Sequence, residues 1–470
     1  MRKWQNLAAP DDPNSWYDVD GVAPTLRGTY ERITYTDATS AAATGSSTLK
    51  YAFAAPTLTG SREYVLSSSI IWEFAAGAYT ARTGGVTIGA TPMMEQYGNV
   101  TICAMGNTTD TVYSTGGNFA ALAGAPDAEI VVTQSNAVLL FNTSASADGW
   151  AASDVGDYTN WTTGEAASGR LIATPGPISA AVAFGDSVIV FKPVSIYRMR
   201  YVGGTVKWAA ELIHQSAGCS LTGSATLSGF EKYSACPSQY GVLFAGPNYA
   251  YNAAAVSHAL AYWLNDSGQV DIVNPLTALF SSSGKPYIRY LPDEDIFSVF
   301  DVASGIAYFF SPSVMAWGKA VPYASAANIV PVLGDTAGIL LNRSAVPVAH
   351  RYISADVLTR YTPSTTKSGV SYLQSSMYGA PNLKTNFTRV TPLLRVREAL
   401  GSPVAALTVD FYREREGTAG ITQQSVTEST QRRRFDFLGT DNFARFKLTY
   451  TDIDFEIDDI LVAFTIAGTD

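Results

Sequence analysis

The sequence predicts an all-β protein, and three observations lead to that fold class. Only 15% of the 470 residues are charged, well below the share typical of globular chains. The 39 glycines and 22 prolines are typical of short strands joined by turns. The 26 tyrosines suit a half-buried pleated surface. We therefore predict a β-propeller-like central domain, a C-terminal β-sheet platform domain and an irregular N-terminal segment.

Residues 1–60 are the first predicted unit, an N-terminal arm that forms part of the platform. The stretch "DDPNSWYDVDGVAP" is rich in turn-forming residues, and "SAAATGSSTLK" has few residues suited to a core. No apolar run near the start has the length of a secretory signal core, and none in the chain approaches the length of a membrane span. We expect neither a leader peptide nor a membrane-spanning segment.

Residues 61–355 are predicted to form the β-propeller. Short β-rich runs recur here and are broken by Gly, Pro, Asn and Asp, as in "AEIVVTQ" (128–134) followed by "AVLLFNT" (137–143). The groups of runs begin roughly 40 to 55 residues apart, which is the span of one four-stranded blade. Stacking several blades around an axis would bury faces that a lone meander leaves exposed. A set of β-sandwiches with irregular spacing is the alternative.

Residues 356–470 are predicted to form a compact β-rich platform domain. A linker-like stretch, "TRYTPSTTKSG", is followed by alternating runs such as "VAALTVDFYRERE" (404–416) and "FARFKLTYT" (443–451). Alternation with a period of two is typical of strands that bury one face.

The residues that carry common enzymatic chemistry are scarce. Three histidines, His214, His258 and His350, show no metal-ligand spacing. Three cysteines are far apart, and we interpret them as free structural thiols. The nucleophile-elbow, phosphate-loop and dinucleotide-binding motifs do not occur. We therefore predict no catalytic residues, no metal, no cofactor and no enzymatic activity.

An acidic strand near the C-terminus is the first candidate site. In "TDIDFEIDDI" the acidic residues recur with a period of two, so an unbroken strand would place them on one face. This face could be a solvated sheet surface, a wall presented to something that must not adhere, or a calcium site. The residues are Asp452, Asp454, Glu456 and Asp458.

A basic run is the second candidate site. In "QRRRFDF", Arg432, Arg433 and Arg434 precede Phe435 and Phe437. Like charges in a row usually mark a solvated edge. They could equally form salt bridges with acidic residues of a neighbouring subunit, so the run is a candidate subunit interface. It is too isolated in an acidic chain to grip DNA.

Three motifs resemble a pattern found in the tail nozzle, or lower tail hub, proteins of short-tailed bacteriophages. The first is "SDVGDYTNW" (153–161), and the second is "ISAAVAFGDSVIVFKPVSIYRMRYVGG" (178–204). The third is "QRRRFDFLGTDNFARFKLTY" (431–450), in which Arg433 stands where the pattern has Gly. The resemblance covers roughly residues 150–205 and 380–465.

The resemblance implies a non-enzymatic structural protein of the virion tail, assembled in the bacterial cytoplasm. The resemblance also implies a homohexamer. Each subunit would combine a propeller with a β-rich platform, and the ring would lie below the portal and adaptor rings. The implied partners are the adaptor ring, tail fibres or spikes, a needle or plug, and double-stranded DNA that passes without specific binding.

The net charge supports a passage that repels DNA. Each chain carries a formal charge of −9, so six copies would carry about −54. The acidic face at Asp452–Asp458 is then the candidate channel wall. The alternative function is a carbohydrate-binding or carbohydrate-processing propeller of a phage tail, which would require a pair of carboxylates in a pocket.

Overall fold

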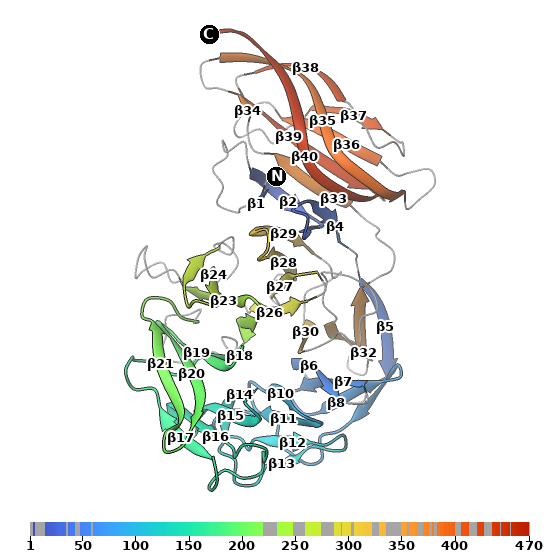
Figure 1. Cartoon of the computed structure of the whole chain (residues 1–470). Helices are drawn as coiled ribbons and strands as arrows, with labels where there is room; N and C mark the ends of the chain where they lie inside the picture. The colour runs from blue at the N-terminus through green and yellow to red at the C-terminus, as the bar shows by residue number, and fades with distance from the viewer. Residues whose placement is uncertain are drawn as a thin grey trace.

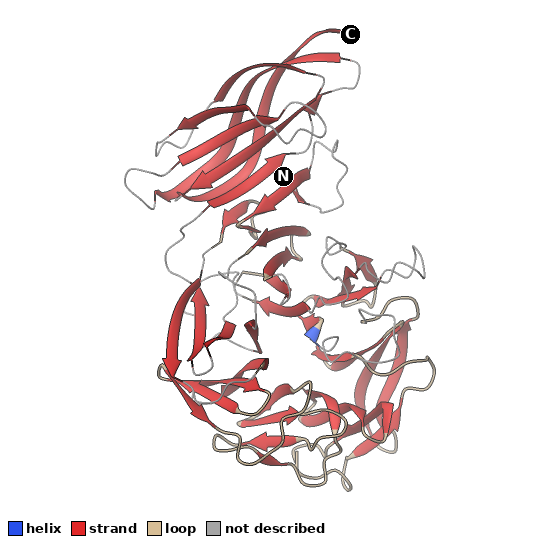
Figure 2. Ribbon diagram, turned by 180° about the vertical axis from the view of Figure 1, so that it is seen from behind, coloured by secondary structure: helices blue, strands red, loops and turns tan. Residues whose placement is uncertain are grey.

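The computed structural model contains a ring of small β-sheets joined to an elongated β-platform (Figure 1, Figure 2). It describes residues 3–4, 15–33, 36–42, 48–57, 60–219, 233–247, 259–273, 286–292, 294–301, 305–321, 329–334, 349–354, 357–363, 370–375, 378–379, 383–399, 406–412, 421–426, 435–441, 443–451 and 453–469. In this part of the chain, no helix is long and apolar enough to cross a membrane.

The ring is a β-propeller, in agreement with the predicted fold class. The first four blades are antiparallel four-stranded units. They comprise β6 (Leu49–Thr57), β7 (Gly60–Ser67), β8 (Ile71–Ala75) and β9 (Ala78–Ala81); β10 (Met93–Tyr97), β11 (Val100–Ala104), β12 (Val112–Ser114) and β13 (Ala120–Ala121); β14 (Ala128–Gln134), β15 (Ala137–Thr143), β16 (Ser146–Ala152) and β17 (Ala167–Arg170); and β18 (Ala180–Phe184), β19 (Ser187–Lys192), β20 (Ser195–Gly203) and β21 (Lys207–His214).

The remaining three blades complete a ring of seven within the described residues. They comprise β22 (Ala235–Pro237), β23 (Gly241–Pro247), β24 (Ala259–Asn265) and β25 (Val270–Ile272); β26 (Pro286–Leu291), β27 (Ile296–Asp301), β28 (Ile306–Ser311) and β29 (Ala316–Ala320); and β30 (Ile329–Gly334), β31 (Ala349–Ser354), β32 (Val357–Pro363) and β5 (Thr36–Ala42). The first strand of each blade contacts the first strand of the next, so these strands surround the axis.

The continuous apolar runs arise because both faces of a blade are covered. On β19, Val188 and Val190 pack into the core shared with the third blade, whereas Ile189 and Phe191 pack into the core shared with the fifth. Successive side chains point to opposite faces of a strand, so a strand between two blades needs apolar residues at every position. Each of the seven described core clusters accordingly contains residues from two neighbouring blades.

The ring closes through N-terminal strands that the sequence analysis assigned to an irregular arm. Within residues 1–60, β5 is the outer strand of the last blade and pairs with β32, while β6 is the inner strand of the first blade. The inner strands β30 and β6 also pair in parallel. This part of the arm is strand because its backbone groups complete the edges of two blades. The polar composition of β5 did not indicate a strand of the ring, because an outer strand of a blade faces water.

The platform combines strands from both ends of the chain. It contains β1 (Lys3–Trp4), β2 (Ser15–Asp20), β3 (Val22–Pro24), β4 (Tyr30–Arg32), β33 (Val370–Ser375), β34 (Tyr378–Gly379), β35 (Leu383–Ala399), β36 (Ala406–Tyr412), β37 (Ile421–Val426), β38 (Phe435–Asp441), β39 (Phe443–Thr451) and β40 (Ile453–Thr469). Tyr450 of β39 and Phe455 of β40 stack with their ring centroids 3.8 Å apart inside its core. The chain passes from propeller to platform between β32 and β33.

A single core spans the junction between propeller and platform. The outer strand β29 of the sixth blade pairs with both β1 and β3. Trp317 of β29 is buried, and its indole nitrogen donates to the carbonyl of Val273 at 2.8 Å. The cluster around it continues from Phe310 in the blade to Trp16 and Leu373 in the platform. The two parts therefore share buried side chains as well as backbone hydrogen bonds.

We predict that Gly318→Ala weakens this junction. A Cβ at Gly318 would lie 2.3 Å from the carbonyl oxygen of Val22, so β29 and β3 would have to separate. Overpacking of this kind costs about 1–3 kcal/mol. Denaturant unfolding should show that loss, whereas Gly117→Ala, where nothing lies within 4 Å of the added atom, should unfold like the unaltered chain. Equal stability of the two variants would contradict the prediction.

Candidate functional site

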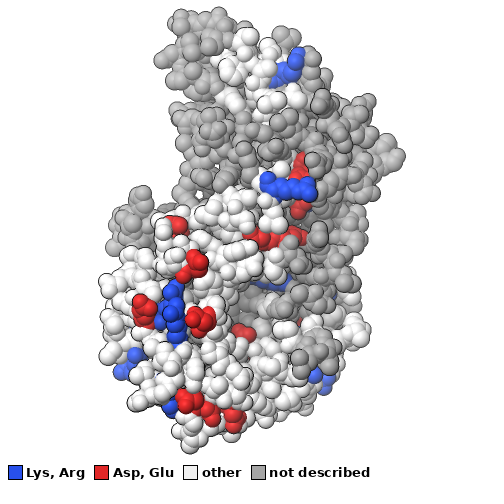
Figure 3. All heavy atoms as spheres, in the orientation of Figure 1, with Lys and Arg blue, Asp and Glu red and all other residues white. Residues whose placement is uncertain are grey.

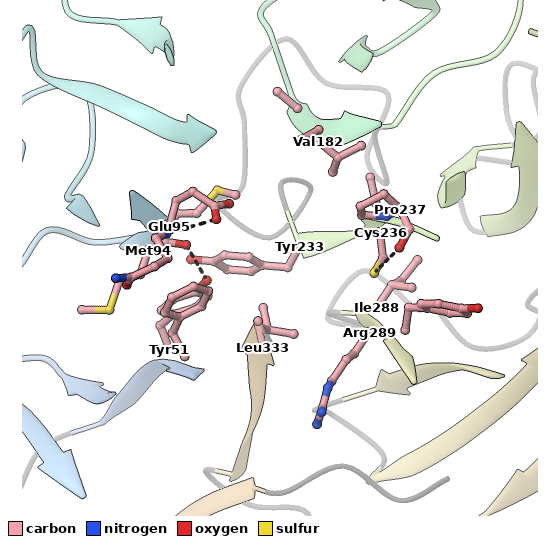
Figure 4. Close-up of a pocket in the computed structure, with 18 of the residues that line it drawn as sticks. Tyr51, Met94, Glu95, Val182, Tyr233, Cys236, Pro237, Ile288, Arg289 and Leu333 are labelled. Atoms are coloured by element: carbon pink, nitrogen blue, oxygen red, sulfur yellow. Dashed lines mark hydrogen bonds between the residues drawn. The ribbon is translucent and has the colours of Figure 1, made fainter. Parts of the chain in front are cut away.

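A cavity of about 430 Å³ lies at the propeller axis (Figure 4). Its walls come from the inner strands of six blades: β6, β10, β18, β22, β26 and β30. The lining is mainly apolar and aromatic. The residues labelled in Figure 4 are Tyr51, Met94, Glu95, Val182, Tyr233, Cys236, Pro237, Ile288, Arg289 and Leu333.

Glu95 is the acidic group of this cavity. It lies on β10, and burial raises the pKa of its carboxyl group from 4.5 to about 7, against the lowering effect of a hydrogen bond from the Gln96 amide. That hydrogen bond, from the Gln96 N–H to Oε1 at 3.0 Å, is the one given to this carboxyl group by the described residues. Near neutral pH the side chain is therefore close to half ionised.

A stack of tyrosines forms the wall beside Glu95. The Tyr51 and Tyr233 rings stack with centroids 5.0 Å apart, and Tyr233 stacks on Tyr287 at 4.9 Å. The hydroxyl of Tyr51 donates to the carbonyl of Met94 at 3.5 Å, and that of Tyr233 donates to the carbonyl of Pro92. Burial raises the pKa of all three phenols, so the stack is neutral at physiological pH.

Arg289 and Cys236 lie on the opposite wall, on β26 and β22. Burial raises the pKa of the Cys236 thiol to about 12, and the Arg289 charge partly opposes that rise. The thiol is protonated at neutral pH and is a poor nucleophile. The charge of Arg289 therefore acts on the Cys236 side of the cavity, whereas the pKa of Glu95 is governed by burial and a backbone hydrogen bond. The cavity can bind a ligand, and Cys236 is not an activated nucleophile in it.

The "FKPVSIY" motif forms a structural lock in the fourth blade. Lys192 is buried, and its ammonium group donates to the carbonyls of Leu171 and Thr174 at 2.7 and 2.6 Å. The hydroxyls of Ser195 and Tyr197 each lie 2.7 Å from the Thr174 hydroxyl oxygen. Burial lowers the pKa of Lys192. By binding these two carbonyls, Lys192 attaches the connection between the third and fourth blades to the fourth blade.

The "SDVGDYTNW" motif is also a structural turn, between β16 and β17. The Asp154 carboxylate accepts hydrogen bonds from the Val155 and Glu165 amides at 2.9 and 2.7 Å, and from the Asn160 side chain at 3.1 Å. A Cβ at Gly164 would collide with this carboxylate. The aspartate therefore organises the loop and has its oxygens occupied by protein donors.

A buried charged network crosses the seam where the ring closes, and the sequence analysis did not find it. Glu63 of β7 binds the Arg360 guanidinium through two hydrogen bonds of 2.7 and 2.8 Å, and His350 Nε2 lies 2.6 Å from its Oε1. The other ring nitrogen of His350 lies 2.7 Å from the Tyr79 hydroxyl. These charges hold the pKa of Glu63 down at about 2 despite its burial. No local motif could reveal this network, because 287 residues separate Glu63 from His350.

Of the four residues of the predicted acidic face, only Glu456 has a side chain that the structure describes, and it does not face solvent. Glu456 is only 5% exposed, and the Thr29 hydroxyl donates to its carboxylate at 2.6 Å. The register of β40 shifts against β35 beside Asp458, and Phe455, Ile457 and Ile460 are all buried. The prediction did not include the N-terminal strand β4, which pairs with β40 at Glu456 and brings Thr29 onto its carboxylate. Glu456 is therefore removed from the candidate channel wall.

The other candidate residues remain predictions. The backbones of Asp454 and Asp458 belong to β40, and the structure describes nothing further of their side chains. Asp452 and the run Arg432, Arg433 and Arg434 lie outside the described residues. No cluster of metal-ligating side chains occurs in the part of the chain that the structure describes. On the face shown in Figure 3, described acidic and basic side chains are interspersed.

Comparisons with known proteins identify no family. No family model and no curated protein matches the chain. Solved structures with similar folds include PorZ, a surface component of the Porphyromonas gingivalis type-IX secretion system, at 9% identity and a TM-score of 0.40 over 74% of this chain and 45% of that one. The WD40 domain of Toxoplasma gondii coronin matches at 10% identity and a TM-score of 0.40, covering 72% of this chain and 88% of that one.

A third similar structure is the WD40 domain of Neurospora crassa Pan2, at 10% identity and a TM-score of 0.39, covering 68% of this chain and 90% of that one. In the comparison with PorZ, this chain spans less than half of the length of that protein. The propeller fold itself is established by the strand pairing and by the cores shared between blades.

We predict that Glu95→Gln stabilises the protein at high pH. The folded pKa of about 7 exceeds the ordinary value of 4.5, so the folded state binds the additional proton and the wild type loses stability as the pH rises between these values. At pH 8 the variant should gain up to about 3 kcal/mol in unfolding free energy, and at pH 4.5 about 0.5 kcal/mol or less. Guanidinium unfolding at both pH values measures the difference. Glu211→Gln is the control, because Glu211 lies on the exposed surface of β21. It should leave the unfolding free energy unchanged at both pH values.

We predict that Glu63→Gln, unlike Glu95→Gln, destabilises the protein at neutral pH. The folded pKa of about 2 lies below the ordinary 4.5, so the stabilisation by this carboxylate is complete above pH 4.5 and declines as the pH falls towards 2. At pH 7 the variant should lose about 3–5 kcal/mol, because Arg360 would be left without its carboxylate. Asp186→Asn, which breaks an exposed pair with Arg200 at 3.6 Å, should lose less than about 1 kcal/mol. Similar losses of unfolding free energy in both variants would contradict the prediction that the seam pair contributes more stability than the surface pair.

Proposed function

We propose that this protein is a structural subunit of the tail nozzle of a short-tailed bacteriophage, and that it is not an enzyme. The observation that carries the proposal is that the motif that resembles the pattern of that family is a structural device. Lys192, Ser195 and Tyr197 all converge on the 171–174 connection. A motif that fixes the path of the backbone is a signature of a particular fold, as a scaffold protein requires.

The junction supports a role as a rigid connector. Lys319 of β29 pairs with Asp18 of β2 at 3.0 Å, and the Tyr372 hydroxyl donates to the other oxygen of Asp18 at 2.7 Å. Lys447 lies 3.9 Å from the centroid of the Tyr372 ring. Together with the shared core, these contacts couple propeller and platform. A subunit that forms part of a channel requires its two parts to keep a fixed relative position.

The platform surface supports assembly with neighbouring copies. Strands β35 and β40 each have 17 residues, a length of about 56 Å, and β40 ends far from the propeller (Figure 1). On its distal half, Leu461 and Phe464 are 56% and 48% exposed. They lie three positions apart and so point to opposite faces. We propose that neighbouring copies cover these two exposed apolar side chains in the assembly.

In the proposed assembly, six copies surround a channel through which DNA passes. The net charge of −9 per chain would oppose adhesion of DNA to the wall. The platform would meet the adaptor ring, and the remaining surfaces would carry fibres or spikes and a needle or plug. We place the protein in the virion tail, after assembly in the bacterial cytoplasm, with Arg432–Arg434 as candidate interface residues.

The proposal is tested by electron cryo-microscopy of the tails of particles that carry this chain, without imposed symmetry. We expect six copies around an axial channel below the portal and adaptor. Absence from the particle, or a peripheral position on the fibres, would overturn the proposal and favour the carbohydrate-binding alternative. The mass of the purified chain, alone and with Leu461→Asp, should further show whether the platform surface mediates self-association.

A further inference from the structure

We propose that the axial cavity is a binding site for a small organic cation, consisting of an ammonium or guanidinium group on an apolar body. The inference concerns the propeller alone and is independent of the proposed role in the tail. It rests on the combination of an acidic group, an aromatic wall and a volume within the range of ligand pockets. Each of these features selects a different property of the ligand.

The acidic group selects the charge of the ligand. Glu95 lies on the cavity wall, and within the described residues its carboxyl group accepts one hydrogen bond, from Gln96 N–H. A carboxylate has about four acceptor positions, so most of its capacity is available to a donor in the cavity. A cationic donor would form a short, charge-assisted hydrogen bond and stabilise the ionised form.

The aromatic wall selects an organic cation over an inorganic one. Tyr51, Phe53, Tyr233 and Tyr290 all line the cavity. Aromatic faces attract ammonium and guanidinium groups, and they also cover an apolar body. A divalent metal ion requires several oxygen ligands, which this wall does not supply because Val182, Leu333 and Ile288 form much of it. The volume of about 430 Å³ is within the range of ligand pockets.

The other charged and titratable groups around the cavity leave Glu95 as the cation-binding end. Arg289 of β26 acts on Cys236 of β22, at the opposite wall. Tyr51 of β6 and Tyr233 are neutral because burial raises the pKa of each phenol. Glu129 of β14 accepts a hydrogen bond from the Thr91 hydroxyl at 2.8 Å. The ligand therefore lies with its charged head at Glu95 and its body along the tyrosine stack.

The inference also gives a role to a carboxyl group whose ionised form is disfavoured by its burial. An ionised Glu95 in this cavity costs stability above pH 7, and a glutamine of the same shape would not. Groups that oppose stability in this manner are concentrated at functional sites. A bound cation would offset that cost, and at neutral pH it would displace the proton from the half-ionised carboxyl group.

The test is isothermal titration calorimetry of the full chain with 2-phenylethylammonium and its neutral isostere, 2-phenylethanol. At pH 8 we expect the amine to bind at least tenfold more tightly than the alcohol. Glu95→Gln should reduce amine affinity at least tenfold, whereas Glu211→Gln should leave it unchanged. At pH 7, titrations in two buffers of different ionisation enthalpy should show release of about half a proton with the wild type and none with Glu95→Gln.

Several results would overturn the inference. These are equal affinity for amine and alcohol, unaltered amine binding by Glu95→Gln, or no binding of 2-phenylethylammonium or n-butylammonium up to about 10 mM. Guanidinium unfolding of Glu95→Gln at pH 8 distinguishes a loss of affinity from a folding defect, because a folded variant that has lost amine affinity supports the inference. Failure of this test would leave the tail-nozzle proposal unaffected, since that proposal depends on particle location and assembly.

Discussion

Closure of the blade ring is the constraint on which the rest of the structure depends. Every blade buries both faces against its neighbours, so one missing contact would expose two apolar sheets. The seam is therefore the critical place, and it combines the parallel pair β30–β6 with the β5 strand and the buried Glu63–Arg360 pair. A buried ion pair requires accurate geometry to offset desolvation. The seam thereby fixes the register in which the first and last blades meet.

The closed ring determines what happens at its centre and at its rim. At the centre, inner strands of six blades converge and leave an aromatic cavity that contains Glu95. At the rim, β29 continues into the platform through β1 and β3, so the two parts share one core. The same N-terminal segment supplies strands to platform and ring. The N-terminal segment therefore connects the platform to the sixth blade through β1 and β3, and it contributes β5 to the seventh blade.

Two glutamates of the propeller show how the surroundings decide what a residue does. Arg360 and His350 lower the pKa of Glu63 to about 2, and this glutamate stabilises the seam. Burial, opposed only by a hydrogen bond from the Gln96 amide, raises the pKa of Glu95 to about 7, so its neutral form is favoured below that pH. Desolvation acts on both, so the difference lies in the charged partners that distant strands supply. We attribute a structural role to the first and a binding role to the second.

The sequence by itself determined the all-β class, because low charge, frequent turn residues and unbroken apolar runs such as that of β19 are local properties. It also marked the motifs around Asp154 and Lys192, although their function as locks required the positions of Thr174 and Glu165. Only the tertiary structure decided the ring closure, the Glu63 network and the Glu95 cavity, since these join residues from strands far apart in the chain. It likewise decided the burial of Glu456, because the strand β4 that pairs with β40 at this residue comes from the opposite end of the chain.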